Sequence, residues 1–379
     1  MPKKNDPQPT RLSPKTRAAS SKTSVNNDPP IKTRTSLKDL AEYLGLSQTT
    51  ISFVLNDAPL AKNLTEETRR RVHEAARKFN YRPSYFALNL NKRGSDSVGL
   101  IAPDHSEGYF TKVMAGAERY FVQKKFMYFT TCHYWQPELI QEYPRMLLSR
   151  GAEGLLLLNS NADFESPLPI VTISGHLEKE GVTNVVLDHL AAARVTLRHL
   201  YELGHRKIAF MKGHNTVIDT AYRWEANQQA AREIGVVFAL ERTVEIQEAG
   251  WSPEIGYSAV KRLLSTTRDF TALVGFNDTS AIGAIRAFHE VGLRVPQDIS
   301  VVGFDDVVSA EFNVPSLTTI RQPLTEMGRL GASILLDRIA DPSREYDKTI
   351  FMKPKLVVRE STAPALHRTR PTAGGSKQR

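Results

Sequence analysis

The chain has 379 residues, enough for two or three domains, and its 41% hydrophobic and 24% charged residues are typical of a globular protein. Its only cysteine, Cys132, excludes an intrachain disulfide and any zinc site built on cysteines. No apolar run approaches the roughly 20 residues that cross a bilayer, and no apolar segment follows the basic N-terminus to form a secretory signal. We therefore expect a cytoplasmic protein.

Positive charge is concentrated at the front of the chain. Residues 1–93 contain 18 Lys and Arg against 8 Asp and Glu, whereas residues 94–360 contain 28 against 33. Residues 361–379 add four basic residues and no acidic one. This distribution indicates that the front of the chain meets a polyanion, although a solvated basic tail would have the same composition.

Composition separates two tails from two folded regions. Residues 1–35 and 361–379 are rich in Pro, Ser, Thr and basic residues and poor in large apolar ones, so we expect disorder there. Residues 36–82 favour three short helices, at 37–44, 48–55 and 66–79. Residues 95–360 alternate apolar strands with amphipathic helices, which is typical of a parallel α/β fold.

The three short helices predict a helix-turn-helix. Ser36 and Ser47 are suited to cap the first two helices, and Gly45 permits the sharp turn between them. The apolar side chains of the second helix then pack inward, and its outer face is left for a DNA groove. That outer face carries Gln48, Thr49, Ser52 and Phe53. A plain helical hairpin without a DNA role is the alternative.

The larger region predicts nine strands and six helices in alternation. The strands are expected at 98–102, 126–131, 154–158, 170–173, 184–187, 207–211, 271–275, 299–302 and 317–320. The helices are expected at 110–124, 190–203, 221–234, 258–264, 279–291 and 323–339. Because nine strands exceed one small sheet, we expect two doubly wound lobes, with ligands bound where the carboxyl ends of their strands face a shared cleft.

Seven motifs occur in a fixed order along residues 36–360. They are LKDLAEYLGLSQTTISFVLN (37–56), NYRP (80–83), VGLI (98–101), LGHRKIA (203–209), FND (276–278), ISVVGFDD (299–306) and LTTIRQ (317–322). Together they resemble the lactose-repressor (LacI/GalR) family of bacterial transcription regulators. The resemblance implies a helix-turn-helix DNA-binding headpiece over 36–82 and a hinge helix and linker over 83–94. It further implies a two-lobed, periplasmic-binding-protein-like domain over 95–360 that binds an effector and dimerises.

In the headpiece, the resemblance places the base-reading positions on Gln48, Thr49 and Phe53. The ring of Phe53 could contact a thymine methyl group, or it could pack on the headpiece itself. Ser52 and Asn56 match positions that contact phosphates or cap the helix, and such contacts set register without reading sequence.

The hinge helix corresponds to residues 84–91. In the family this segment folds on the operator and wedges a leucine into the minor groove; Leu90 matches the wedge and Ala87 the position of close approach. Eight residues are too few for a stable isolated helix, which suits folding coupled to DNA binding. An ordinary interdomain linker is the alternative.

In the larger domain, the family's ligand-contacting positions fall on six residues: Ser174, Arg223, Trp251, Asn277, Asp305 and Gln322. Arg, Asp, Asn and Gln bond hydroxyl groups and an indole stacks on a sugar ring, so a carbohydrate effector is implied. Ser174 stands where the lactose repressor has an acid, so the effectors are expected to differ. Asn277 and Asp305 could instead cap the helices that follow their strands.

Enzyme and metal functions find little support. No nucleotide-binding, HExxH or nucleophile-elbow motif is present. His189, His199 and His205 have no matching acid or thiol cluster, so we expect packing or surface roles, no metal and no cofactor.

A sugar-binding transport protein is the other class that two α/β lobes allow, but it would need an export signal. The sequence thus predicts a ligand-responsive repressor, not an enzyme, that binds palindromic operator DNA as a homodimer at the nucleoid.

Overall fold

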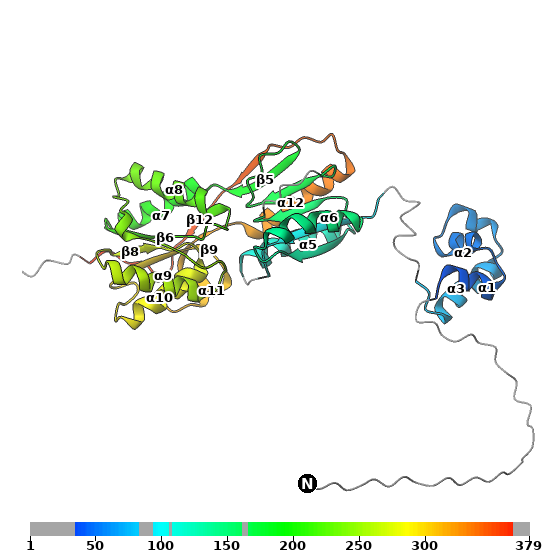
Figure 1. Ribbon diagram of the computed structural model, residues 1–379, viewed down its shortest axis with the longest axis horizontal. Helices are drawn as coiled ribbons and strands as arrows, with labels where there is room; N and C mark the ends of the chain where they lie inside the picture. Colours follow the sequence, from blue (N-terminus) through cyan, green and yellow to red (C-terminus); the bar gives the residue numbers. More distant parts are fainter. Residues whose placement is uncertain (1–34, 83–93, 106–107, 161–165, 367–379) are drawn as a thin grey trace, which may run out of the picture. The chain divides into compact units, whose positions relative to one another are not determined.

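The computed structural model describes residues 35–82, 94–105, 108–160 and 166–366 (Figure 1). The chain divides into two compact units, residues 1–93 and 94–379, and each is described by itself. Within the described residues, no helix is both long and apolar enough to span a bilayer.

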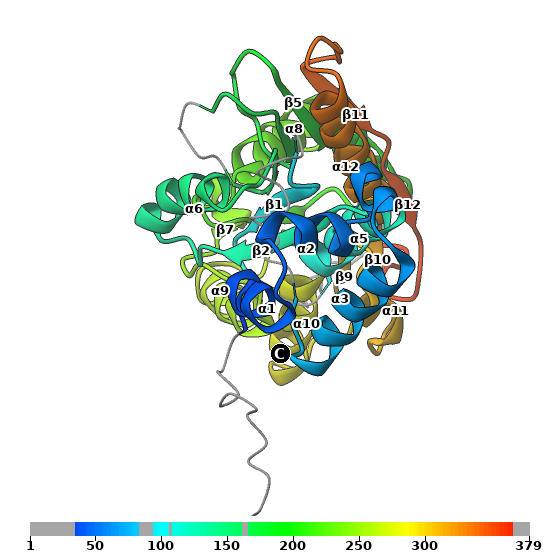
Figure 2. The same cartoon turned by 90° about the vertical axis from the view of Figure 1, so that its right-hand side faces the viewer.

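The first unit contains the helix-turn-helix that the sequence predicts. Its helices are α1 (Leu37–Leu44), α2 (Gln48–Leu55) and α3 (Glu66–Lys78), with a 3-10 helix η1 (Pro59–Asn63) before α3 (Figure 2). The hydroxyls of Ser36, Ser47 and Thr65 each accept a hydrogen bond from the backbone N–H of the third residue of the helix that follows. Gly45 ends α1 at φ 64°, a conformation that glycine adopts without strain. The fully buried core of this unit includes Leu40, Ile51, Val54 and Val72.

The second unit begins with a six-stranded parallel sheet, which we call the first lobe. Its strands are β1 (Ser97–Ala102), β2 (Met127–Cys132), β3 (Leu155–Leu158), β4 (Ile170–Ile173), β5 (Val182–Leu187) and β11 (Thr349–Met352), in the order β11-β5-β4-β3-β1-β2. Helices α5 (Tyr109–Gln123) and α12 (Leu324–Ala340) pack on one face, and α6 (Pro137–Ser149) packs on the other. Strands β3 and β4 are buried along their whole length, as expected for a parallel sheet covered on both faces.

Two glycines allow α5 and α12 to cross closely. A Cβ atom on Gly116 would lie 1.9 Å from the backbone oxygen of Thr325, and one on Gly328 would lie 1.9 Å from that of Val113. The helix pair is therefore packed backbone to backbone, and neither position can accept a side chain without separating the helices.

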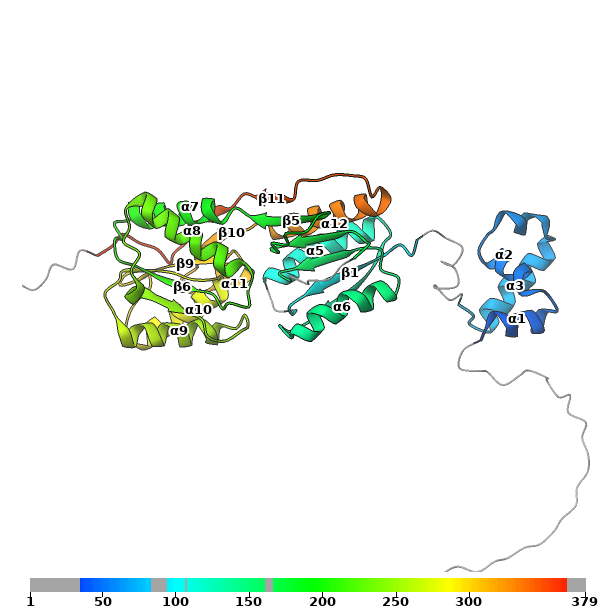
Figure 3. The ribbon, with the colours of Figure 1, turned by 45° about the horizontal axis from the view of Figure 1, so that its top comes forward.

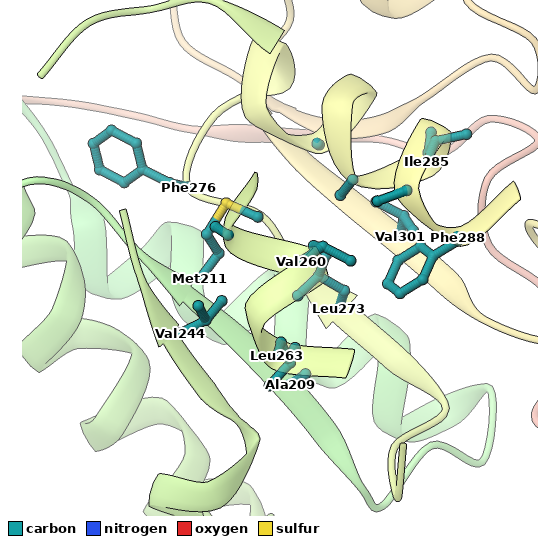
Figure 4. Close-up of a cluster of buried hydrophobic side chains, with 14 of the residues drawn as sticks. Ala209, Met211, Val244, Val260, Leu263, Leu273, Phe276, Ile285, Phe288 and Val301 are labelled. Carbon is teal, nitrogen blue, oxygen red and sulfur yellow. The ribbon is translucent and has the colours of Figure 1, made fainter. Parts of the chain in front are cut away.

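The second lobe repeats this architecture. Its strands are β6 (Ile208–Lys212), β7 (Thr243–Glu245), β8 (Ala272–Val274), β9 (Ser300–Asp305), β10 (Thr318–Arg321) and β12 (Lys355–Val357), in the order β12-β10-β9-β8-β6-β7, with β12 antiparallel to β10. Helices α7 (His189–Glu202) and α8 (Asp219–Ile234) share one hydrophobic cluster with the sheet, and α9 (Pro253–Thr266) and α10 (Asp278–Glu290) share another. Figure 4 shows part of the latter cluster, in which Leu263 and Phe288 face Leu273 and Val301. The short elements are η2 (Leu240–Arg242) and α11 (Val308–Phe312).

The chain passes between the lobes three times (Figure 3). It crosses after β5 into α7, after β10 into α12, and between β11 and β12. A small apolar cluster joins Leu187, Ile320 and Met352, which end strands at these crossings or lie next to them, with Phe304 of β9. Apart from β12, the strands of both sheets are parallel, and Ser174, Asn277, Asp305 and Gln322 lie at or just after the carboxyl ends of their strands.

The predicted elements are present with shifts of a few residues, but seven of the described elements were missed, the 3-10 helices η1 and η2 among them. The short strands β7, β11 and β12 have few residues and lie at sheet edges, so they carry little periodic signal. Helix α6 contains Pro144, which argues against a helix in sequence analysis. Helix α11 has only five residues. Residues 361–366, assigned to the C-terminal tail, pack on the second lobe, where the buried Ser361 hydroxyl donates to the backbone oxygen of Val301.

Candidate functional site

The outer face of α2 is arranged as a DNA-reading helix requires. Gln48 and Thr49 lie in its first turn with exposed side chains, while Ser47 is occupied as the N-cap, 3.0 Å from the backbone nitrogen of Thr50. The Nδ2 group of Asn56 donates to Oγ of Ser52 at 3.1 Å, so these two predicted phosphate-contacting residues form one polar pair. Their position on an exposed helix face leaves this pair open to a polyanion.

Phe53 makes the packing contact that the sequence left open as its second alternative. It is half-buried and packs against the headpiece core formed by α1, α2 and α3. The second alternative that the sequence left open, packing on the headpiece itself, therefore describes this side chain. Ala87 and Leu90, predicted for the minor groove, lie outside the described residues.

Arg223 is the central cation of the second lobe's polar cluster. It lies on the buried face of α8, with 9% of its surface exposed. Its Nη1 donates to the backbone oxygen of Phe276 at 2.6 Å, and its guanidinium carbon lies 3.8 Å from the ring centre of Phe304. The buried Nε has no hydrogen-bond partner among the described residues, so one donor is available to a ligand.

Asp305 and Gln322 form a second polar group beside Arg223. They follow adjacent strands, and Nε2 of Gln322 donates to Oδ1 of Asp305 at 2.6 Å. Burial raises the pKa of Asp305 to about 6, against the opposing effects of the Arg223 charge and the Gln322 hydrogen bond. The Oε1 atom of Gln322 is buried without a hydrogen-bond partner within the described part of the chain. This pair therefore presents an ionisable acceptor and a second, unused acceptor.

Asn277 has the structural role that the sequence allowed as an alternative. It is the N-cap of α10, where its Oδ1 accepts a 2.8 Å hydrogen bond from the backbone nitrogen of Ser280. Its amide NH₂ group is left for a ligand. Asp305 does not cap α11: that helix begins after Val307 without a side-chain cap, and the Val307 nitrogen donates to the buried Asp278 instead.

Ser174 and Trp251 extend the site to the junction of the lobes. Ser174 ends β4 at φ 52°, and its hydroxyl accepts from the buried Tyr109 at 2.5 Å. The ring of Trp251 lies 5.5 Å from that of Phe110 in the first lobe and 6.3 Å from that of Phe276 in the second. Its buried Nε1 has no hydrogen-bond partner among the residues described. Trp251 thus offers both an aromatic face and a free donor.

A buried histidine–aspartate cluster adjoins this site and was missed by the sequence. Nε2 of His176 lies 3.0 Å from Oδ1 of Asp219, and Nε2 of His189 lies 3.3 Å from the same oxygen. The expectation that His189 has no matching acid is therefore wrong, because the fold supplies Asp219 from 30 residues further along the chain. Burial raises the pKa of Asp219, but His189, His176 and Arg223 together hold it well below its ordinary value.

The other two histidines have the packing roles expected of them. His205 is buried and bonds the hydroxyls of Thr271 and Ser300 at 2.8 and 3.0 Å. His199 bonds Thr362 at 3.0 Å, and burial lowers its pKa. Both tie the final described residues to the second lobe.

Comparisons with known proteins match both units. Residues 36–84 match the family described as bacterial regulatory proteins, lacI family, and residues 197–362 match the periplasmic binding protein-like domain. The HTH-type transcriptional repressor PurR of Haemophilus influenzae is 31% identical over 341 residues, covering 87% of this chain and 99% of that protein. The protein of the same name from Salmonella newport is 33% identical over 344 residues, covering 86% and 96%.

Solved structures share the fold. A complex of the transcriptional regulator CelR with cellobiose is 25% identical, with a TM-score of 0.64 over 86% of this chain and all of that one. The lac repressor dimer bound to operator and the anti-inducer ONPF is 24% identical, with a TM-score of 0.72 over 87% and 99%. The two family matches agree with the full-length similarity to the two PurR repressors and with the shared fold. The chain belongs to the LacI family of bacterial regulatory proteins and is a DNA-binding transcriptional repressor, not an enzyme.

Proposed function

We propose that this repressor reads a near-palindromic operator as a homodimer and is controlled by a sugar or sugar derivative bound between its lobes. The observation that carries the effector proposal is a set of buried hydrogen-bonding atoms without partners. Nε of Arg223, Nε1 of Trp251 and Oε1 of Gln322 all lack partners within the described residues, although buried polar atoms are nearly always paired. A ligand rich in hydroxyl groups supplies both donors and acceptors to such a set.

The chemistry around these atoms favours a carbohydrate. The indole of Trp251 can stack on the C–H face of a sugar ring, while Asp305 and Arg223 can bond its hydroxyl groups. CelR, a relative of similar fold, was solved with cellobiose. We place Ser174 and the amide of Asn277 at the edge of the same site.

For operator reading, we assign base contacts to Gln48 and Thr49, the exposed residues of the first turn of α2. The polar pair of Ser52 and Asn56 is suited to a phosphate oxygen. We assign Phe53 to support of the recognition helix rather than to base reading, because it packs on the headpiece core.

The hinge completes the proposed contacts with the operator. We propose that Ala87 and Leu90 enter the minor groove and bend the operator, at the nucleoid in the cytoplasm. This assignment rests on the match of the hinge sequence to the family.

Exposed apolar side chains support self-association of the second unit. The edge strand β2 and the neighbouring α5 expose Met127 by 60% and Val122 by 65%. Helix α11 and the residues after it expose Phe312 by 77% and Val314 by 89%. Apolar surface of this kind marks protein interfaces, and two-fold symmetry would present two headpieces to two half-sites.

The effector proposal is tested by a thermal-shift screen of monosaccharides and disaccharides, cellobiose included. A ligand at 100 times its dissociation constant adds about 2.7 kcal/mol of stability. We expect one sugar class to raise the melting temperature of the wild type, and Gln322→Ala to reduce that shift. Purines and amino acids serve as comparison ligands. A response to one of these, with none to any sugar, would contradict the carbohydrate assignment.

The dimer and operator are tested together. An operator is first selected from random duplexes, and sedimentation is then measured with and without it. We expect two chains per duplex. A stable monomer on saturating operator, or a tetramer that disappears when residues 367–379 are removed, would contradict the proposal.

A further inference from the structure

We propose that His176, His189 and Asp219 form a binding site for a divalent transition-metal ion of the zinc class at the junction of the lobes. The three side chains place their ligand atoms, Nε2, Nε2 and Oδ1, within 4.8 Å of one another. Two imidazole nitrogens and one carboxylate oxygen are a donor set typical of Zn²⁺, and not of Mg²⁺ or Ca²⁺, which prefer oxygen alone.

The distances fit a tetrahedral ion. With metal–ligand bonds of about 2.0–2.1 Å, tetrahedral ligand atoms lie about 3.3 Å apart. The two nitrogen–oxygen distances of 3.0 and 3.3 Å are already close to that value. Only the distance between the two nitrogens has to adjust, within the 4.8 Å limit that the cluster keeps. Three protein ligands leave a fourth position for water or for an oxygen of a small molecule.

A second observation comes from His189. It is 7% exposed, and neither ring nitrogen makes a hydrogen bond of good geometry to any described residue. A buried imidazole without a partner is costly, and its Nε2 is directed at the carboxylate that would share the ion. A hydrogen bond to Asp219 accounts for His176, whereas His189 lies 3.3 Å from the same oxygen without hydrogen-bond geometry. An ion between the three side chains would take Nε2 of His189 as a ligand together with Nε2 of His176 and Oδ1 of Asp219.

The cluster joins both lobes. His176 follows β4 of the first lobe, whereas His189 begins α7 and Asp219 begins α8 of the second. Its His176 ring stacks on Tyr222 with centroids 3.6 Å apart, which holds the imidazole in place. A bound ion would therefore tie the loop after β4 to two helices across the junction. This inference does not depend on the identity of the effector.

The test uses the full-length, tag-free protein after treatment with a chelator. We expect calorimetry to show one Zn²⁺ per chain and Co²⁺ to give the intense visible absorption of a tetrahedral site. His189→Gln and Asp219→Asn should each weaken Zn²⁺ binding at least tenfold. His199→Gln is the matched control, since His199 lies on the same helix and bonds Thr362 away from the cluster, and it should bind as the wild type does.

A third variant, at the more exposed His176, provides a test in case the other two variants fail to fold. His176→Gln changes a loop residue, and its folding can be checked by circular dichroism without metal. We expect Zn²⁺ to raise the melting temperature of the wild type and of His199→Gln, but not of His176→Gln. The proposal is overturned if the wild type binds no stoichiometric Zn²⁺, if Mg²⁺ displaces it, or if folded cluster variants bind as tightly as the wild type.

Discussion

Replacing Asp305 by Asn should stabilise the protein without ligand while weakening its response to the effector. The pKa of this carboxyl is raised from 3.8 to about 6, mainly by burial. Two pKa units correspond to about 3 kcal/mol, because each unit is worth about 1.4 kcal/mol. Asn keeps the shape and can still accept the hydrogen bond from Gln322, and it tolerates the φ of 113° at this position better than most residues.

The difference in stability between the wild type and Asp305→Asn should depend on pH. Below about pH 4 the carboxyl is protonated in both the folded and the unfolded chain, so wild type and Asp305→Asn should have similar stability. As the pH rises to about 6, the unfolded chain ionises first and the wild type loses stability. The advantage of the variant should therefore grow to about 1–2 kcal/mol at pH 5 and to about 3 kcal/mol above pH 7.

Urea unfolding at pH 5, 6, 7 and 8 measures this difference, and Asp306→Asn is the matched control. Although burial raises the pKa of Asp306, hydrogen bonds from Arg321 and Arg359 hold it below its ordinary value. That variant should therefore be the less stable protein at neutral pH. If Asp305→Asn were less stable than the wild type at pH 8, or if its advantage did not change with pH, the burial argument would be refuted.

The other predictions address the remaining parts of the molecule. Asp305→Asn and Arg223→Ala should each weaken effector binding about fivefold to 150-fold by calorimetry, because a lost bond to a buried ligand costs about 1–3 kcal/mol; wild-type affinity in both would remove them from the site. Arg223→Ala should also lower the urea midpoint, since it leaves the backbone oxygen of Phe276 without its donor, while operator affinity without effector stays unchanged. Leu90→Ala should weaken operator binding in fluorescence anisotropy and leave effector binding intact, and equal loss of both would contradict the hinge assignment. Gly328→Ala should cost about 1–3 kcal/mol of stability by forcing α12 away from α5, and an unchanged urea midpoint would show that the helices separate freely.

The headpiece shows which structural features local sequence information predicts and which it does not. The bounds of α1 and α2 were predicted without error, because short-range signals define them: the serine caps, the apolar spacing and Gly45. The side-chain position of Phe53 was not decided in the same way. Both of its alternatives are compatible with the helix, and the packing contact comes from a core that several helices of the headpiece build together.

In the second unit, the sequence predicted the alternation of strands and helices. It did not predict that two strands near the end of the chain each add to an edge of one sheet. Strands β11 and β12 are short, follow α12, and join different lobes. Their pairing with β5 and β10 depends on chain crossings far apart in sequence. Periodicity within a short segment cannot report such a contact.

For the candidate sites too, some properties followed from the sequence and others only from the tertiary structure. Sequence alone determined that the chain carries a helix-turn-helix and two α/β lobes, and its resemblance to a family proposed Arg223, Asp305 and Gln322 as ligand contacts. Only the tertiary structure decided that Asn277 serves as a cap, that Asp305 has a pKa near 6, and that His176 and His189 meet Asp219. The sequence signals for a helix, such as caps and apolar spacing, involve residues three or four positions apart. The burial of a side chain, its interaction with other charges and its position relative to a ligand depend on groups far apart in the sequence, which the three crossings between the lobes bring together.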